Sequence, residues 1–218
     1  MKKRVKIIAA ITGCAAIFAA SAGFTNAFLA NTTNDLTNVI TPGGIGIGLE
    51  EPGWKPEDAK NVLPRKIIKK DPYVVNTGKN EEWAFLRVTV PVKEISVVDP
   101  DTKRKLPAAS TELFGFQASE NWTLVSKIVD GSAAYYVYGY NMVMKPGEKT
   151  DFLFQEVSMV NYLEGSIDEE ETLTLPIEAV SIQYNVDSAG DGLKEIYEDY
   201  LAQEIADKAE SQETADKA

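Results

Sequence analysis

The chain has 218 residues, with 22 Lys and Arg against 33 Asp and Glu, one cysteine and no histidine. Without histidine there is neither a Ser–His or Cys–His catalytic pair nor a histidine-based zinc site, and one thiol cannot form an intrachain disulfide. The formal net charge of −11 disfavours binding to nucleic acid, because neutralising phosphates requires Lys and Arg. We therefore expect no enzymatic activity, no cofactor and no nucleic-acid partner.

The first 27 residues have the organisation of a secretory signal peptide. Four basic residues lie within residues 2–6, an apolar stretch occupies residues 7–22, and small residues follow. This pattern predicts export, with cleavage between Ala27 and Phe28. The alternative is a retained transmembrane anchor formed by the same stretch.

The single cysteine, Cys14, lies inside this apolar stretch. Together with residues 11–13 it resembles a lipoprotein box, and lipidation there would tether the protein to a membrane. The apolar run continues beyond Cys14, however, whereas a lipoprotein usually turns polar after its cysteine. We therefore expect Cys14 to leave with the signal peptide, so that the membrane is contacted only before cleavage.

Residues 41–186 have the pattern of a single all-β domain. Short β-rich runs occur at 45–49, 83–92, 121–129, 134–144, 152–160 and 172–185. Turn signals separate them, namely Glu51-Pro52-Gly53, Asn76-Thr77-Gly78, Asp99-Pro100-Asp101 and Pro146-Gly147. Many short strands separated by turns favour an antiparallel β-sandwich. A βαβ sheet would need helical stretches between the strands, and few are visible.

Two segments of this domain have distinctive patterns. Residues 83–92 are apolar in both alternating sets, which predicts a central strand covered on both faces. Residues 102–120 are mixed in character, and we expect a long loop or a short helix there. The basic triplet 103–105 within them indicates a solvated turn, with a binding patch as the alternative.

The period of the apolar residues changes near the end of the chain. Helical spacing relates Leu193, Ile196, Tyr197, Tyr200, Leu201 and Ile205. This predicts an amphipathic helix within residues 187–205 that packs on the sandwich, or alternatively binds a partner. The apolar stripe then stops, and Ala-Asp-Lys-Ala occurs twice within residues 206–218, which is typical of a disordered acidic tail.

One segment has partial calcium-loop spacing. Asp187, Asp191, Gly192 and Glu198 occupy positions 1, 5, 6 and 12 of such a loop, but Ala189 at position 3 has no side-chain oxygen. The alternative is a turn followed by a capped helix. Since one ligand is missing, we predict no metal site, and no motif predicts a catalytic or cofactor-binding residue.

Several motifs, taken in order, resemble those of the TasA/camelysin family of exported Gram-positive proteins. The matching residues are Gly23–Phe28, Ile45–Trp54, Lys70-Asp71-Pro72, Asn76-Thr77-Gly78, Trp83, Asn121-Trp122, Tyr136–Tyr138, Pro146-Gly147-Glu148, Thr150, Phe152-Leu153-Phe154, Val157 and Ile182-Gln183. The resemblance spans most of the chain and follows a signal peptide of the expected kind.

The resemblance implies a jelly-roll-like β-sandwich, secreted to the extracellular matrix or cell surface of a Gram-positive bacterium. It also implies processing by a signal peptidase of the SipW type and self-association into biofilm-matrix fibres. In that family a subunit donates its N-terminal segment as a strand to the next subunit. Here the donor would be residues 28–40, with Phe28, Leu29, Leu36, Val39 and Ile40 as its apolar contacts. The alternative is a merely flexible N-terminal segment.

Two other functions are weighed against a fibre subunit. The same sandwich is compatible with a monomeric binding module for the cell surface or the matrix. The camelysin label of this family also suggests a secreted metalloprotease. The chain has no H-E-x-x-H helix and no histidine, so a zinc-bound water of the usual kind has no scaffold.

Overall fold

The computed structural model describes residues 45–60, 62–168, 171–185 and 190–215. The described residues up to Tyr184 belong to one compact unit, which we call the β-domain, and those from Asn185 onward belong to another. The described strands are β1 (Ile47–Glu50), β2 (Ile67–Lys69), β3 (Tyr73–Asn76), β4 (Glu82–Ile95), β5 (Ala109–Glu112), β6 (Phe114–Phe116), β7 (Trp122–Asp130), β8 (Ala133–Tyr140), β9 (Glu156–Met159) and β10 (Ile177–Gln183). A short 3-10 helix, η2 (Pro56–Ala59), follows β1.

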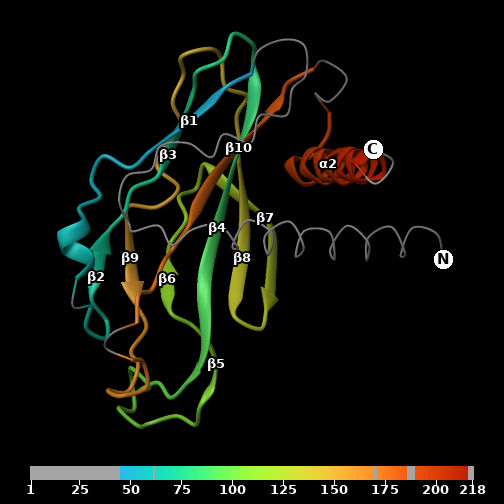
Figure 1. Cartoon of the computed structure of the whole chain (residues 1–218). Coiled ribbons are helices and arrows are strands. Elements are labelled where there is room, and N and C mark those ends of the chain that lie inside the picture. The colour runs from blue at the N-terminus through green and yellow to red at the C-terminus, as the bar shows by residue number, and fades with distance from the viewer. Residues whose placement is uncertain (1–44, 61, 169–170, 186–189, 216–218) are drawn as a thin grey trace. The chain divides into compact units, whose positions relative to one another are not determined.

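The largest sheet of the β-domain is built around β4. Its order is β10-β4-β8-β7, every neighbouring pair is antiparallel, and the four strands lie side by side in Figure 1. The far end of β4 pairs with β5. The strand β4 is central because it is long and apolar enough to accept a neighbour along each edge.

The remaining strands form two smaller antiparallel sheets. One contains β1 and β3, and the other has the order β2-β9-β6. Backbone hydrogen bonds from Thr150 to Val74 and from Leu153 to Pro72 join β3 to the segment that leads into β9. The two small sheets therefore lie next to each other along the same stretch of chain.

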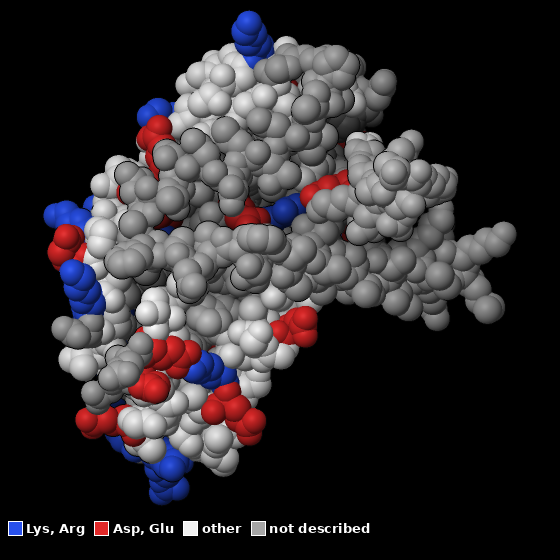
Figure 2. Space-filling view, in the orientation of Figure 1, with Lys and Arg blue, Asp and Glu red and all other residues white. Residues whose placement is uncertain are grey.

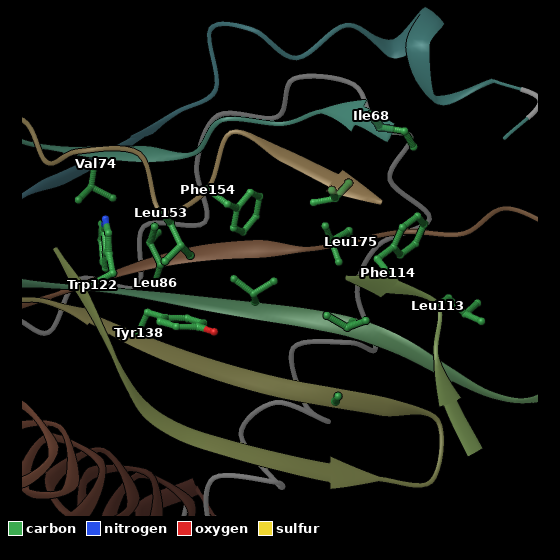
Figure 3. Packing of buried hydrophobic residues seen from close by; sticks show 14 of the residues in the cluster. Ile68, Val74, Leu86, Leu113, Phe114, Trp122, Tyr138, Leu153, Phe154 and Leu175 are labelled. Atoms are coloured by element: carbon green, nitrogen blue, oxygen red, sulfur yellow. The ribbon is translucent and has the colours of Figure 1, made fainter. Parts of the chain in front are cut away.

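One hydrophobic core is shared by strands of all three sheets. It contains Val74 of β3, Leu86 of β4, Tyr138 of β8, and Phe154 and Val157 near or in β9. Figure 3 shows Leu153 and Phe154 pointing from their segment toward the β4 side of this cluster. The β-domain is thus an antiparallel all-β unit, as the spacing of short strands and turns predicts.

The prediction of a strand covered on both faces is confirmed in β4. Leu86 and Val88 face the core, whereas Phe85 and Arg87 point the other way, and all four are buried. The Arg87 guanidinium lies 3.8 Å from the carboxylate of Glu178, its cross-strand partner in β10. The rest of the second set, Trp83, Thr89, Pro91 and Lys93, is half-buried, so cover on this face is complete only in the middle of the strand.

The predicted turn at Pro146-Gly147 is also confirmed. The Glu148 backbone N–H donates to the Lys145 carbonyl at 3.0 Å, which closes a four-residue turn. Gly147 has a φ of +80°, which a side chain would make unfavourable. The turn returns the chain toward β3, where Asn76 N–H bonds to the Glu148 carbonyl at 2.9 Å.

The prediction of a loop or short helix over 102–120 is wrong. This stretch contains β5 and β6. The strand β5 has the sequence Ala-Ser-Thr-Glu and is largely exposed, so it has no alternating apolar signal. Pairing with the end of β4 determines that it is a strand, and a tertiary contact of this kind overrides local composition.

The C-terminal helix is longer than predicted. The helix α2 (Leu193–Ala215) extends through most of the segment expected to be a disordered tail. Residues 193–215 contain neither glycine nor proline and are rich in Ala, Glu, Lys and Gln, which are good helix formers. At its start, the backbone N–H of Gly192 donates to the Glu195 carboxylate, in the manner of a capping box. The predicted stripe residues Ile196, Tyr197, Tyr200 and Leu201 are buried.

Candidate assembly interface

The strand β7 has an edge to which no described strand pairs. Among the residues that the structure describes, β7 is hydrogen-bonded to β8 alone. A two-residue turn, Gly131-Ser132, joins the two strands, and Gly131 has a φ of +46°, as the first central residue of a type II′ turn requires. With Asp130 and Ala133 paired across this turn, the alternation of an antiparallel ladder points the backbone groups of Lys127 and Val129 away from β8.

The core-facing side of β7 has exposed apolar side chains. Leu124 and Val129 are 47% and 53% exposed, although their cross-strand partners Tyr138 and Ala134 are buried core residues. Directly opposed residues share one face of a sheet, so these two side chains face the core side. A bulge between Leu124 and Ser126 places both on that face despite their odd separation. The core-facing side of β7 is therefore covered at Trp122, which belongs to the core, and exposed at Leu124 and Val129.

Lys127, in the edge strand β7, is bound by side chains of β5 and β8. Its ammonium group lies 2.7 Å from the carboxylate of Glu112 in β5 and 4.8 Å from the ring centroid of Tyr136 in β8. The Tyr136 hydroxyl also donates to Glu112, and the hydrogen bond to Glu112 raises the pKa of Lys127 above its ordinary value. A lysine standing at a free edge discourages strand addition, but here the charge is drawn inward.

The start of β7 is fixed by a hydrogen-bonded corner around Asp151. The indole N–H of Trp122 donates to the Asp151 carbonyl at 3.1 Å, and the Asn121 side-chain amide donates to the Asp151 carboxylate at 2.6 Å. The Tyr140 hydroxyl lies 3.3 Å from the same carboxylate. Asn121 and Trp122, two of the residues that carry the family resemblance, therefore anchor the edge strand.

The Lys70-Asp71 motif of the resemblance holds the turn after β1. The buried Lys70 ammonium bonds to the Glu51 carboxylate at 2.9 Å and lies 4.9 Å from the ring centroid of Trp54. The buried Asp71 carboxylate accepts a hydrogen bond from the Gly53 backbone N–H at 2.8 Å. These contacts give the motif a structural role, which the sequence alone did not reveal.

The Asn76-Thr77-Gly78 motif holds the beginning of β1. The Asn76 side chain accepts from the Gly78 N–H at 2.8 Å and donates to the carbonyls of Asn80 and Met144. The backbone N–H groups of Thr77 and Gly78 both donate to the Gly46 carbonyl. The segment at Gly46, just before β1, is thus bonded to the end of β3.

Replacing Gly53 by alanine is expected to destabilise the β-domain by about 1–3 kcal/mol, because a Cβ there would overpack a filled site. The added Cβ would lie 2.5 Å from the Asp71 carboxylate. This carboxylate is buried and accepts a hydrogen bond from the Gly53 backbone N–H. Urea unfolding measures the change.

Gly48→Ala is the matched control for this substitution, since its Cβ would meet only ordinary contacts of 3.5 Å or more. An equal loss of stability in both variants would show that the close approach at Gly53 has no special effect.

The residues predicted for signal cleavage and strand donation lie outside the described residues. These are Ala27, Phe28, Leu29, Leu36, Val39 and Ile40. Asp187, the first position of the calcium-like spacing, lies outside them too, while Glu198 is 3.9 Å from the Lys194 ammonium. Within the described residues, no three or more Cys, Asp or Glu side chains gather in a way that would hold a metal ion.

On the face drawn in Figure 2, the acidic and basic side chains of the described residues are interspersed and form no large patch of one sign. The described helices include none that is both long enough and apolar enough to cross a membrane. By fold and geometry the described part of the chain is an antiparallel β-domain, in which β7 is one of the strands at a sheet edge, followed by a helix. Comparisons with models of protein families, with curated proteins and with solved structures found no match.

Proposed function

We propose that this protein is a secreted structural subunit of an extracellular fibre, assembled when residues 28–40 of one copy add a strand to β7 of the next. The observation that carries the proposal is the edge of β7, where Leu124 and Val129 are exposed on the core-facing side of the sheet. An added strand would satisfy the outward backbone groups of β7 and cover these side chains.

The proposal includes a jelly-roll-like sandwich as the subunit fold. Its two layers would be the β10-β4-β8-β7 sheet and the pair of small sheets joined by the residues 147–159 segment. A core shared by Leu86, Tyr138 and Phe154 supports this arrangement. In such a sandwich the second layer reaches β7 at Trp122 but not at Leu124 and Val129, which accounts for the exposure of these two side chains.

The N-terminal segment has the length and composition for the donor role. Residues 28–40 include Phe28, Leu29, Leu36, Val39 and Ile40, and a Pro-Gly-Gly sequence separates them from β1. Export and cleavage after Ala27 by a signal peptidase of the SipW type would free this segment outside the cell. The fibre would then belong to the biofilm matrix or cell surface of a Gram-positive bacterium.

Electron microscopy of three purified chains tests strand donation. Residues 28–218 are expected to form regular fibres, whereas residues 41–218 and the uncleaved chain are expected to remain unpolymerised. If residues 41–218 polymerise like residues 28–218, donation by this segment is rejected. If residues 28–218 stay monomeric at every salt concentration and pH, the monomeric binding module becomes the better proposal.

Val129→Pro in residues 28–218 tests β7 as the acceptor. Proline removes the outward N–H without removing a bond to β8, so the fold is expected to persist while fibres are lost. Val129→Thr keeps the N–H and the strand propensity and is expected to polymerise. Normal fibres from a folded Val129→Pro variant would move the acceptor to another edge.

A further inference from the structure

Glu82, the first residue of β4, has a buried carboxyl group without a partner. Its side chain is 0% exposed, and neither Oε1 nor Oε2 has a hydrogen-bond partner. An ionised carboxylate in such a place is costly, because it loses its hydration and gains neither a well-formed hydrogen bond nor a counter-charge. The fibre proposal assigns no role to this group.

Glu82 lies where three segments of the β-domain meet. Its backbone exchanges hydrogen bonds with Met144 at 2.9 and 3.0 Å, and its cross-strand partner is Gln183 at the end of β10. The third segment is Gly46, the residue before β1, whose N–H lies close enough to act on the carboxyl group without meeting hydrogen-bond geometry.

Burial raises the pKa of Glu82 to about 7, and the Gly46 backbone opposes this shift only in part. The charged side chains on the segments around it are Lys79, Glu81, Lys145 and Glu148. All four are exposed, and none of them contributes to the shift. The pKa of Glu82 is therefore raised by burial between the three segments and not by a neighbouring charge.

We propose that Glu82 is a proton-controlled latch that holds the start of β1 to the rest of the β-domain. With a neutral carboxyl group the three segments pack together. Ionisation places an unpaired charge among them, and the least costly relief is to admit water by loosening β1. This follows because β1 is a four-residue strand that is hydrogen-bonded, among the described strands, to β3 alone, whereas β4 and β10 are longer paired strands. The inference does not depend on strand donation.

Amide hydrogen exchange of the full chain, compared between the wild type and Glu82→Gln, tests the latch. At pH 6 the amides of Ile47–Glu50 are expected to have similar protection in both proteins. Between pH 6 and pH 8.5, protection of these amides in the wild type is expected to fall about tenfold relative to the variant, after correction for intrinsic rates. Val137, buried in β8, serves as the internal reference and is expected to change little.

Glu81→Gln is the matched control, because Glu81 is the adjacent glutamate and is exposed. It is expected to keep the wild-type pH dependence. The proposal is overturned if Glu82→Gln keeps that dependence as well, or if Val137 loses protection as much as β1 does.

If the Glu82→Gln variant does not fold, measurements on the wild-type protein alone still test the latch. NMR titration of the Glu82 side-chain carboxyl carbon must then give a midpoint near 7 that coincides with the loss of β1 protection. A midpoint in the ordinary range of glutamate, or one separate from the change in β1, rejects the latch.

Discussion

Phe154→Ala is expected to lower the free energy of unfolding by about 3–5 kcal/mol, the range for truncating a large buried aromatic side chain. Phe154 is 2% exposed, and its ring centroid lies 4.5 Å from that of Phe116. It belongs to the core cluster that also contains Leu86 and Tyr138 of the large sheet. Alanine would leave a cavity between strands that cannot close without moving backbone.

Urea unfolding of Phe154→Ala, Phe154→Leu and Leu63→Ala tests whether Phe154 belongs to a core shared by the sheets. Phe154→Leu keeps most of the volume and is expected to cost clearly less than Phe154→Ala. Leu63→Ala, at a side chain that is 69% exposed, is expected to stay within about 0.5 kcal/mol of the wild type. A loss below about 1 kcal/mol for Phe154→Ala would mean that this segment does not pack on the large sheet, and the sandwich proposal would fail with it.

Glu82→Gln is expected to stabilise the protein by up to about 3 kcal/mol at pH 8 and to have little effect near pH 4.5. The folded-state pKa of about 7 lies above the ordinary glutamate value of 4.5. The folded protein therefore binds this proton more tightly than the unfolded chain does. This contribution to stability is complete below pH 4.5 and is lost progressively as the pH rises to 7.

The measurement is the difference in unfolding free energy between variant and wild type at several pH values. Taking the difference cancels the titration of the other carboxylates. For Glu81→Gln, at an exposed position, the difference is expected to be small and nearly independent of pH. A flat difference for Glu82→Gln would show that the carboxyl group is hydrated or paired in solution.

Strands with a strong side-chain pattern could be predicted from the sequence. The apolar run that became β4 was predicted as a doubly covered strand because both of its alternating sets are apolar. The turn at Pro146-Gly147 was predictable because proline and glycine have few backbone alternatives there. In such cases local chemistry and tertiary structure favour the same conformation.

Short strands with no apolar alternation could not be predicted. The strand β5 is polar and depends on its pairing with β4, and β6 has only three residues. The end of α2 could not be predicted for the opposite reason. Its predicted end followed the end of the apolar stripe, whereas residues with high helix propensity continue the helix to Ala215.

The candidate assembly interface could likewise be predicted from the sequence only in part. The motifs of the resemblance located Asp71, Asn76 and Trp122, but only the structure showed that they anchor β1 and β7 by hydrogen bonds. Glu82 had no sequence signal, because a glutamate next to a strand normally indicates a solvent-facing end.

By itself, the sequence determined that this is an acidic, histidine-free chain with antiparallel strands and a C-terminal helix. These properties follow from composition and from periods of two and 3.6 residues, which are local. Only the tertiary structure decided that β7 lies at a sheet edge, that Leu124 and Val129 stay exposed and that the Glu82 carboxyl group is buried. Each of these depends on residues far apart in the chain, whose meeting is determined by packing and not by any single segment.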